Sequence, residues 1–252
     1  MRPQHAFVLA VSLVFVIAPA AHADLSRSTP RLGDPGMLSH PATMLVEYFE
    51  RFLKDHDLEG FRRDVAARYT EATLCRVVLA GDVRSRRAAV LALGIGGGIG
   101  CNAVVARTLK DVDPTVRALA VNALWAIWSR ADSPENVAAL DEVQTLIERG
   151  RLDDAIRKAN ALIARAPTFA EALNQRAIAH YLSGRHVESA NDCRRVLELN
   201  PYHFGALSGL GQCQIRLRQR VEAIRTFRRA LDLQPYSDGL RETVAELEAA
   251  GD

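Results

Sequence analysis

Aromatic side chains and lysines are scarce in this 252-residue sequence. Aromatic residues make up 6% of the chain, and only Lys54, Lys110 and Lys158 among its 32 basic residues are lysines. Because few aromatics interleave with the basic residues, stacking on nucleic-acid bases has little support. The net charge of +2 favours neither nucleic acid nor a membrane surface. No nucleic-acid partner is therefore expected.

The other basic residues are all arginines, and many of them cluster near the C-terminal end. The cluster comprises Arg194, Arg195, Arg216, Arg218, Arg220, Arg225, Arg228 and Arg229. Two interpretations stay open for it: a solvated helix face, which we favour, and a basic docking patch.

The sequence also lacks the patterns that mark catalytic and metal sites. No pair of its histidines stands at a metal-ligand spacing with cysteine or carboxylate support, and no G-x-S-x-G motif frames a nucleophilic serine. The run Leu93–Ala103 contains a G-x-G-x-x-A match to the dinucleotide fingerprint. That fingerprint works only between a strand and a helix, and here it follows an amphipathic helix, so we predict a turn. No enzyme activity, metal or cofactor is predicted.

Long hydrophobic runs are confined to the N-terminus, where the pattern is that of a secretory signal. Arg2 precedes an apolar run over residues 6–18, and Ala21-His22-Ala23 fits a cleavage site. The run is shorter than the ~20 apolar residues that span a bilayer. We expect residues 1–23 to be a signal peptide cleaved after Ala23, residues 24–40 to be a disordered leader, and the product to be periplasmic or secreted, without a transmembrane segment.

Helical periodicity begins at Thr43 and predicts three helices, over residues 43–57, 61–69 and 70–80. A 31-residue offset then superposes residues 81–93 on 112–124, and Asp113-Pro114 is a strong helix start. The shared D-P-x-V-R-x-x-A-x-x-A-L pattern resembles HEAT repeats of the short type, over about residues 70–130. The resemblance implies a HEAT-like domain over 41–130, in which Asp and Arg side chains form a ladder between repeats. The ladder residues would be Asp82, Arg86, Asp113 and Arg117.

A second period of 34 residues follows a turn-rich hinge at residues 129–134. Three prolines mark it, together with nearby glycines and small residues: Pro167, Pro201 and Pro235; Gly150, Gly184 and Gly211; Ala155, Ser189 and Ala223. This pattern resembles the tetratricopeptide repeat (TPR), with units at 136–169, 170–203 and 204–237 and a capping helix at 238–250, in a domain over 135–252. The predicted fold is all-α: a right-handed α-solenoid of HEAT-like helix pairs followed by three TPR helix pairs and the cap.

The resemblance also implies a partner-binding groove lined by the first helix of each unit. The candidate residues are Asn174, Ile178, Tyr181, Leu182, Ser208, Gln212, Ile215 and Arg216, and the same family positions hold Glu171, Gly205 and, in the first unit, Val137, Leu140, Gln144, Ile147 and Glu148. Amides here can hydrogen-bond an extended peptide and the apolar side chains offer sockets. An open alternative is that some of them pack on the HEAT-like half or stay solvated. The Lys and Asn set with which family members hold a C-terminal carboxylate is absent.

The function predicted from these features is that of an exported, non-catalytic scaffold that binds a protein or peptide. Two alternatives stay open: a structural subunit of an envelope assembly that uses the arginine-rich outer face, and a lyase-like accessory protein.

Two further residue sets have open roles. The cysteines, Cys75, Cys101, Cys193 and Cys213, form no CxxC pair; we favour four small buried side chains, although Cys193 and Cys213 lie on neighbouring helices and could form a disulfide. Trp125 and Trp128 are three residues apart before the hinge. Helical spacing favours core packing or a seam against the first TPR unit over an exposed ligand platform.

Overall fold

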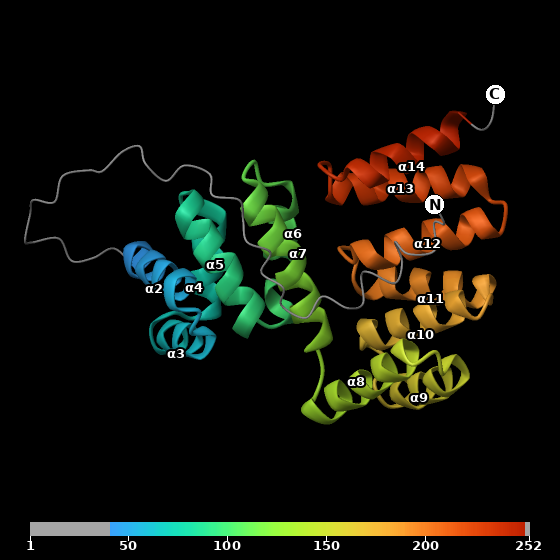
Figure 1. Ribbon diagram of the computed structural model, residues 1–252, viewed down its shortest axis with the longest axis horizontal. Helices are drawn as coiled ribbons and strands as arrows, with labels where there is room; N and C mark the ends of the chain where they lie inside the picture. The colour runs from blue at the N-terminus through green and yellow to red at the C-terminus, as the bar shows by residue number, and fades with distance from the viewer. Residues whose placement is uncertain (1–40, 250–252) are drawn as a thin grey trace, which may run out of the picture.

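A computed structural model describes residues 41–249, and within this range the chain is entirely helical. It forms thirteen α-helices and two short 3-10 helices, with no strand among the described residues. Figure 1 shows two groups of helices: α2 to α7 at one end and the stacked helices α8 to α14 at the other. The predicted signal peptide, the predicted leader and residue 250 of the predicted cap lie outside the described residues. The all-α solenoid prediction is confirmed.

The N-terminal half contains the helices α2 (Pro41–Asp55), α3 (Leu58–Arg68), α4 (Glu71–Ala80), α5 (Val83–Gly96), α6 (Asn102–Arg107) and α7 (Pro114–Ser129), with 3-10 turns η1 (Ile99–Cys101) and η2 (Thr108–Lys110) on either side of α6. Polar side chains start several of these helices. The carboxylate of Asp82 accepts the backbone N–H of Ser85 at 2.8 Å, and that of Asp113 accepts the N–H of Val116 at 2.9 Å. Both satisfy a donor that has no partner within its own helix.

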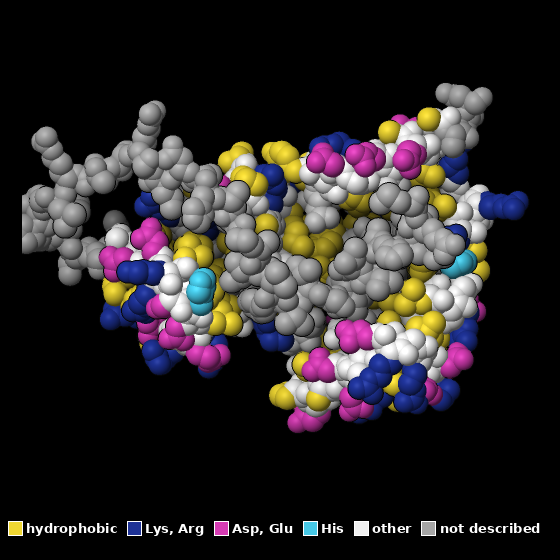
Figure 2. All heavy atoms as spheres, in the orientation of Figure 1, with side chains coloured by type: hydrophobic (Ala, Val, Ile, Leu, Met, Phe, Trp, Pro, Cys, Tyr) yellow, Lys and Arg dark blue, Asp and Glu magenta, His cyan; other side chains and the backbone are white. Residues whose placement is uncertain are grey.

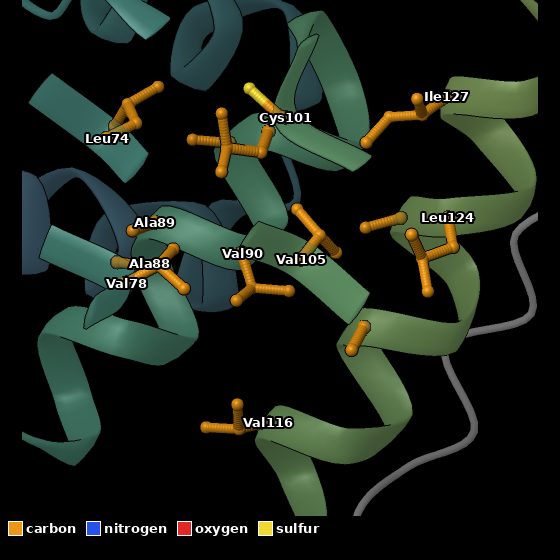
Figure 3. Close-up of a cluster of buried hydrophobic side chains, with 14 of the residues drawn as sticks. Leu74, Val78, Ala88, Ala89, Val90, Cys101, Val105, Val116, Leu124 and Ile127 are labelled. Carbon is orange, nitrogen blue, oxygen red and sulfur yellow. The ribbon is translucent and has the colours of Figure 1, made fainter. Parts of the chain in front are cut away.

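The core of this half is built where α4, α5, α6 and α7 meet. Figure 3 shows Leu74 and Val78 of α4 and Val105 of α6 directed toward the same interior as Leu124 of α7. Small residues allow the helices to approach closely: a Cβ added at Gly94 would lie 2.9 Å from the Cβ of Ala123. The glycine run that follows α5 forms the turn into η1, as the sequence predicts.

Two arginine–aspartate pairs join α5 to the start of α7, in a register that differs from the expected ladder. Arg86 donates to Asp111 at 2.7 and 2.9 Å, and Arg87 donates to Asp113 at 2.9 Å. Arg117 instead donates to the backbone carbonyl of Asp111 at 2.8 Å. The residues predicted as structural do have structural contacts. Each pair, however, includes one residue that the repeat pattern did not single out: Asp111 in the pair with Arg86, and Arg87 in the pair with Asp113.

The C-terminal half is a stack of three helix pairs and a final helix. The pairs are α8 (Pro134–Glu148) with α9 (Leu152–Arg165), α10 (Ala170–Leu182) with α11 (His186–Leu199), and α12 (Phe204–Arg216) with α13 (Arg220–Leu233), followed by α14 (Asp238–Ala249). Gly150 and Gly184 turn the chain between the helices of their units at φ of +71° and +77°, which side chains disfavour.

Small residues lie where the two helices of each pair cross. Ala155, Ser189 and Ala223 are fully buried, and a Cβ at Gly211 would lie 2.5 Å from the ring of Phe227. Ser189 replaces the usual alanine without an unpaired hydroxyl, because its Oγ donates to the carbonyl of Ala177 at 2.7 Å. The crossings are therefore as close as the repeat pattern predicts.

The two halves meet along α7, which runs across the ends of the stacked helices (Figure 1). Trp128 is 1% exposed and stacks on His203, with ring centroids 4.2 Å apart. Trp125 meets His203 and Phe204 edge-on, with centroids 5.4 and 5.3 Å away. The tryptophans thus form a seam between the halves, as one sequence interpretation holds. The prediction that this seam lies against the first TPR unit is wrong. They pack on the junction of the second and third units rather than on the first.

Candidate partner-binding groove

The first helices of the three units, α8, α10 and α12, carry the predicted groove residues. Neighbouring first helices contact one another, so the family positions form one surface across the stack. The exposure of these residues divides the surface into two ends. Along α10 the surface is buried near the start of the helix, where Asn174 lies, and open at the end, where Leu182 lies; the end of α12 is likewise open at Arg216.

Asn174 belongs to the buried part. Its side chain is 3% exposed, and its amide donates to Glu171 Oε1 at 2.9 Å. Gln175 donates to the same oxygen at 2.7 Å. The amide that was expected to bind a peptide backbone is therefore engaged within the protein, because a buried carboxylate requires hydrogen-bond donors.

Ile178 is also covered, with 6% of its surface exposed. It packs with Val143 and Ile147 of α8 and with Ala155 of α9 in one apolar cluster. Ile178 thus joins the first and second units. It does not provide an open socket in this arrangement.

Glu171 and His203 form the centre of the buried end. Glu171 Oε2 lies 3.0 Å from His203 Nε2, and the two side chains are 1% and 0% exposed. His203 Nδ1 accepts the backbone N–H of Ala206 at 3.0 Å, so Nε2 is the nitrogen that donates to Glu171. His203 therefore caps α12, pairs with Glu171 and supports Trp128.

Helix α7 and its neighbours cover this end of the surface from outside. The ring of Trp125 sits against Gly205, where an added Cβ would be 2.5 Å from the ring carbon Cη2. Asn102 joins both halves: its Nδ2 donates to Asn200 Oδ1 at 2.8 Å, and its Oδ1 accepts the indole N–H of Trp128 at 2.8 Å. Gly205 therefore packs on the N-terminal half, as the alternative interpretation of the groove positions holds for some of them.

A second contact between the halves lies farther along α7. The guanidinium of Arg117 stands 4.1 Å from the ring centroid of Tyr236, next to a small crevice of about 170 Å³.

Sequence reasoning missed Glu171, His203, Asn102 and Asn200 as a connected set. The only signal was the pair of tryptophans, whose helical spacing predicts burial without identifying what buries them.

The open end holds the other candidates. Leu182 is 38% exposed and Arg216 is exposed, while Tyr181, Ser208 and Gln212 are half-buried. Arg216 of α12 donates to the hydroxyl of Tyr181 of α10 at 3.4 Å, a hydrogen bond that raises the pKa of Arg216. Two predicted groove residues from consecutive units are thus brought together. Ile215 is half-buried and packs inward against Phe227 and Val244.

The chemistry available at the open end is that of binding. It combines a cationic guanidinium, a phenol, a primary amide and an exposed apolar side chain. Among the described residues no group of histidines, cysteines and carboxylates could hold a metal ion, and no helix between residues 41 and 249 is long and apolar enough to cross a membrane.

Comparison with known proteins places the TPR resemblance on part of the chain. Residues 140–203 match the tetratricopeptide-repeat family model. This match supports a TPR protein. A TPR repeat-containing protein of Rhizobium etli is 30% identical over 101 residues, which are 40% of this chain and 50% of that protein. The chain thus spans about half the length of the curated relative it matches.

Solved TPR structures are similar to larger or smaller parts of the chain. The Sgt2 TPR domain from Aspergillus fumigatus is 21% identical, with a TM-score of 0.45, and the match covers 48% of this chain and 81% of that one. The TPR2AB domain of yeast Sti1, solved in a complex with pHSP90, is 15% identical with a TM-score of 0.41; the match covers 82% of this chain and 96% of that one.

Proposed function

We propose that this protein is an exported, non-catalytic scaffold that binds a protein or an extended peptide at the open end of the TPR groove. The observation that carries the proposal is the pairing of Arg216 with Tyr181 across two units, beside the exposed side chain of Leu182. Together they offer an exposed apolar side chain beside a cation and a hydroxyl group, a combination typical of peptide-binding surfaces.

The groove of this proposal is shorter than the one the repeat resemblance implies. Asn174 and Ile178 serve the internal packing, and the binding residues are Tyr181, Leu182, Ser208, Gln212 and Arg216. In this proposal the HEAT-like half fixes the stack through α7 and closes one end of the groove. A ligand would enter from the ends of α10 and α12 that lie away from α7.

Export is the second part of the proposal and rests on residues 1–23 alone. The basic start, the apolar run and the Ala21-His22-Ala23 site support it. Cleavage after Ala23 would be tested by N-terminal sequencing of the protein recovered from the periplasm or the medium, where an uncleaved product would contradict it.

The outer face of the array is the competing binding surface. Arg225, Arg228 and Arg229 are exposed on α13, and Arg228 pairs with Glu248 of α14 at 2.7 Å. An envelope assembly with an acidic surface could bind there. Exposed arginines are also ordinary on solvated helices, so this second function has weaker support.

Site-specific photocrosslinking distinguishes the two surfaces. A photoreactive phenylalanine analogue would replace Leu182 in one variant and Arg229 in the other, and each would be irradiated in the cells that produce the protein. We expect a discrete adduct from position 182, which a Tyr181→Ala, Arg216→Ala background should abolish. Adducts from position 229 alone would contradict binding in the groove and favour the outer face.

A further inference from the structure

We propose that Cys75 and Cys101 form an intramolecular disulfide when the protein meets a disulfide oxidant. Their sulfur atoms lie 3.2 Å apart in the structure, one on α4 and the other at the end of η1, 26 residues farther along the chain. A disulfide requires a separation of ~2.05 Å. Small rotations of the two side chains bridge the difference, since the sulfurs already face each other.

The other two cysteines have different surroundings. The thiol of Cys213 donates to Ser189 Oγ at 3.2 Å, and Cys193 is 1% exposed within the same apolar cluster. A hydrogen-bonded thiol and a sealed thiol are poor targets for an oxidant. The pairing of Cys193 with Cys213 that the repeat geometry allows is therefore the weaker candidate, and the close pair lies in the N-terminal half.

The exposure of Cys75 and Cys101 sets the order of the reaction. Cys75 is half-buried, so an oxidant can reach it, whereas Cys101 is fully buried. Burial and a hydrogen bond to Glu71 raise the pKa of the Cys101 thiol. Glu71 is held in place by the backbone N–H of Gly98, which donates to its carboxylate at 2.9 Å. Cys75 therefore reacts first and Cys101 closes the bond.

The reaction balances as two thiol–disulfide exchanges. The Cys75 thiolate attacks one sulfur of a low-molecular-weight or protein disulfide, forms a mixed disulfide and releases one thiol. Cys101 then attacks the Cys75 sulfur, its proton passes to the departing thiolate, and a second thiol leaves. The two cysteines lose two electrons and two protons, and the oxidant's disulfide is reduced to two thiols.

The bond would reinforce the junction between the halves of the protein. Cys101 immediately precedes Asn102, whose side chain joins Trp128 to Asn200. A covalent link from α4 to Cys101 would hold the turn that positions Asn102. Oxidation should thus slow opening of the junction, whereas the packing of α8 on α9 has no connection to the bond.

The test is oxidation of the purified protein with glutathione disulfide, followed by alkylation of the remaining thiols under denaturing conditions and mass measurement. We expect two of the four thiols to be lost without glutathione retained, and a linked pair of peptides that contain Cys75 and Cys101. Cys193→Ser and Cys213→Ser should form the same bond, while Cys75→Ser should not. Alkylation of all four thiols, or linkage of Cys193 to Cys213, would overturn the proposal.

A second variant separates the chemistry from any general effect on folding. Glu71→Gln removes the carboxylate that disfavours the Cys101 thiolate, so the mixed disulfide at Cys75 should close faster than in the unaltered protein. Helix content measured by circular dichroism would accompany each variant. An unchanged or slower closure in a folded Glu71→Gln protein would contradict the assigned order of reaction.

Discussion

His203 shows how much one side chain contributes to this structure. It caps α12 through Nδ1, donates to the buried carboxylate of Glu171 through Nε2, and stacks on Trp128. From the sequence, His203 is noteworthy only as a residue without metal-ligand spacing. Its role depends on Glu171, 32 residues earlier, and on Trp128 in the other half, so no local pattern could predict it.

Gly205 provides a direct test of the contact between the halves. Replacing Gly205 with alanine would place a Cβ 2.5 Å from the ring of Trp125. We expect the free energy of unfolding to fall by ~1–3 kcal/mol, because the ring must shift in a packed interface. Urea denaturation followed by circular dichroism would measure the change.

The matched control for this substitution is Gly239→Ala. Gly205 and Gly239 are each the second residue of their helix, α12 and α14, but a Cβ at Gly239 meets nothing within 4 Å. The control should leave stability unchanged or raise it by up to ~1 kcal/mol. Equal effects of the two substitutions on the free energy of unfolding would show that the close approach of Trp125 does not cause the loss of stability at position 205.

Individual helices are the features that the sequence predicts best. The aspartates of the 31-residue repeat start α5 and α7, the prolines of the 34-residue repeat follow the second helix of each TPR pair, and Gly150 and Gly184 turn the chain within the first two pairs. Capping and turn formation depend on neighbouring residues, which a sequence pattern contains. The burial of Asn174 could not be predicted in this way, because a different helix covers that part of α10.

The two helix starts also differ in a testable way. Asp82 caps α5 alone, while Asp113 caps α7 and also pairs with Arg87. We expect Asp82→Ala to lower the free energy of unfolding by ~1 kcal/mol, and Asp113→Ala by ~1 kcal/mol more because it also breaks the ion pair. Chemical denaturation at pH 7 would compare the two variants with the unaltered protein.

The pH dependence of this difference identifies the charge as its source. The hydrogen bonds from Arg87 lower the pKa of Asp113, so its contribution is present above the ordinary aspartate pKa of ~4 and is lost as pH falls through the lowered value. The extra cost of Asp113→Ala should therefore shrink in acid below about pH 4. A difference that stays constant down to pH 2 would attribute it to packing instead.

At the scale of the whole molecule, α7 joins the two groups of helices into one structure. It belongs to the core of the N-terminal half through Leu124 and Ile127, and it presents Trp125 and Trp128 to the TPR stack. Figure 2 shows apolar side chains gathered between the two groups of helices. The tryptophans predict a buried seam, but its location follows from the path of the whole solenoid. That path results from the small rotation between each repeat and the next. The length of a sequence repeat does not determine these rotations.

Removal of Trp125 should loosen the seam and leave each half of the protein folded. In a Trp125→Ala variant, Phe204 and His203 lose an edge-on aromatic contact and Gly205 loses its cover. We expect ~3 kcal/mol less resistance to opening, which corresponds to about 100-fold faster amide hydrogen exchange over residues 200–207. Phe52→Ala is the control, since Phe52 is buried in the N-terminal core against Phe61 and away from the seam. It should speed exchange in α2 and α3 while residues 200–207 stay protected. Equal deprotection by both variants would mean that the halves open only together, so that α7 could not act as a separable closure of the groove.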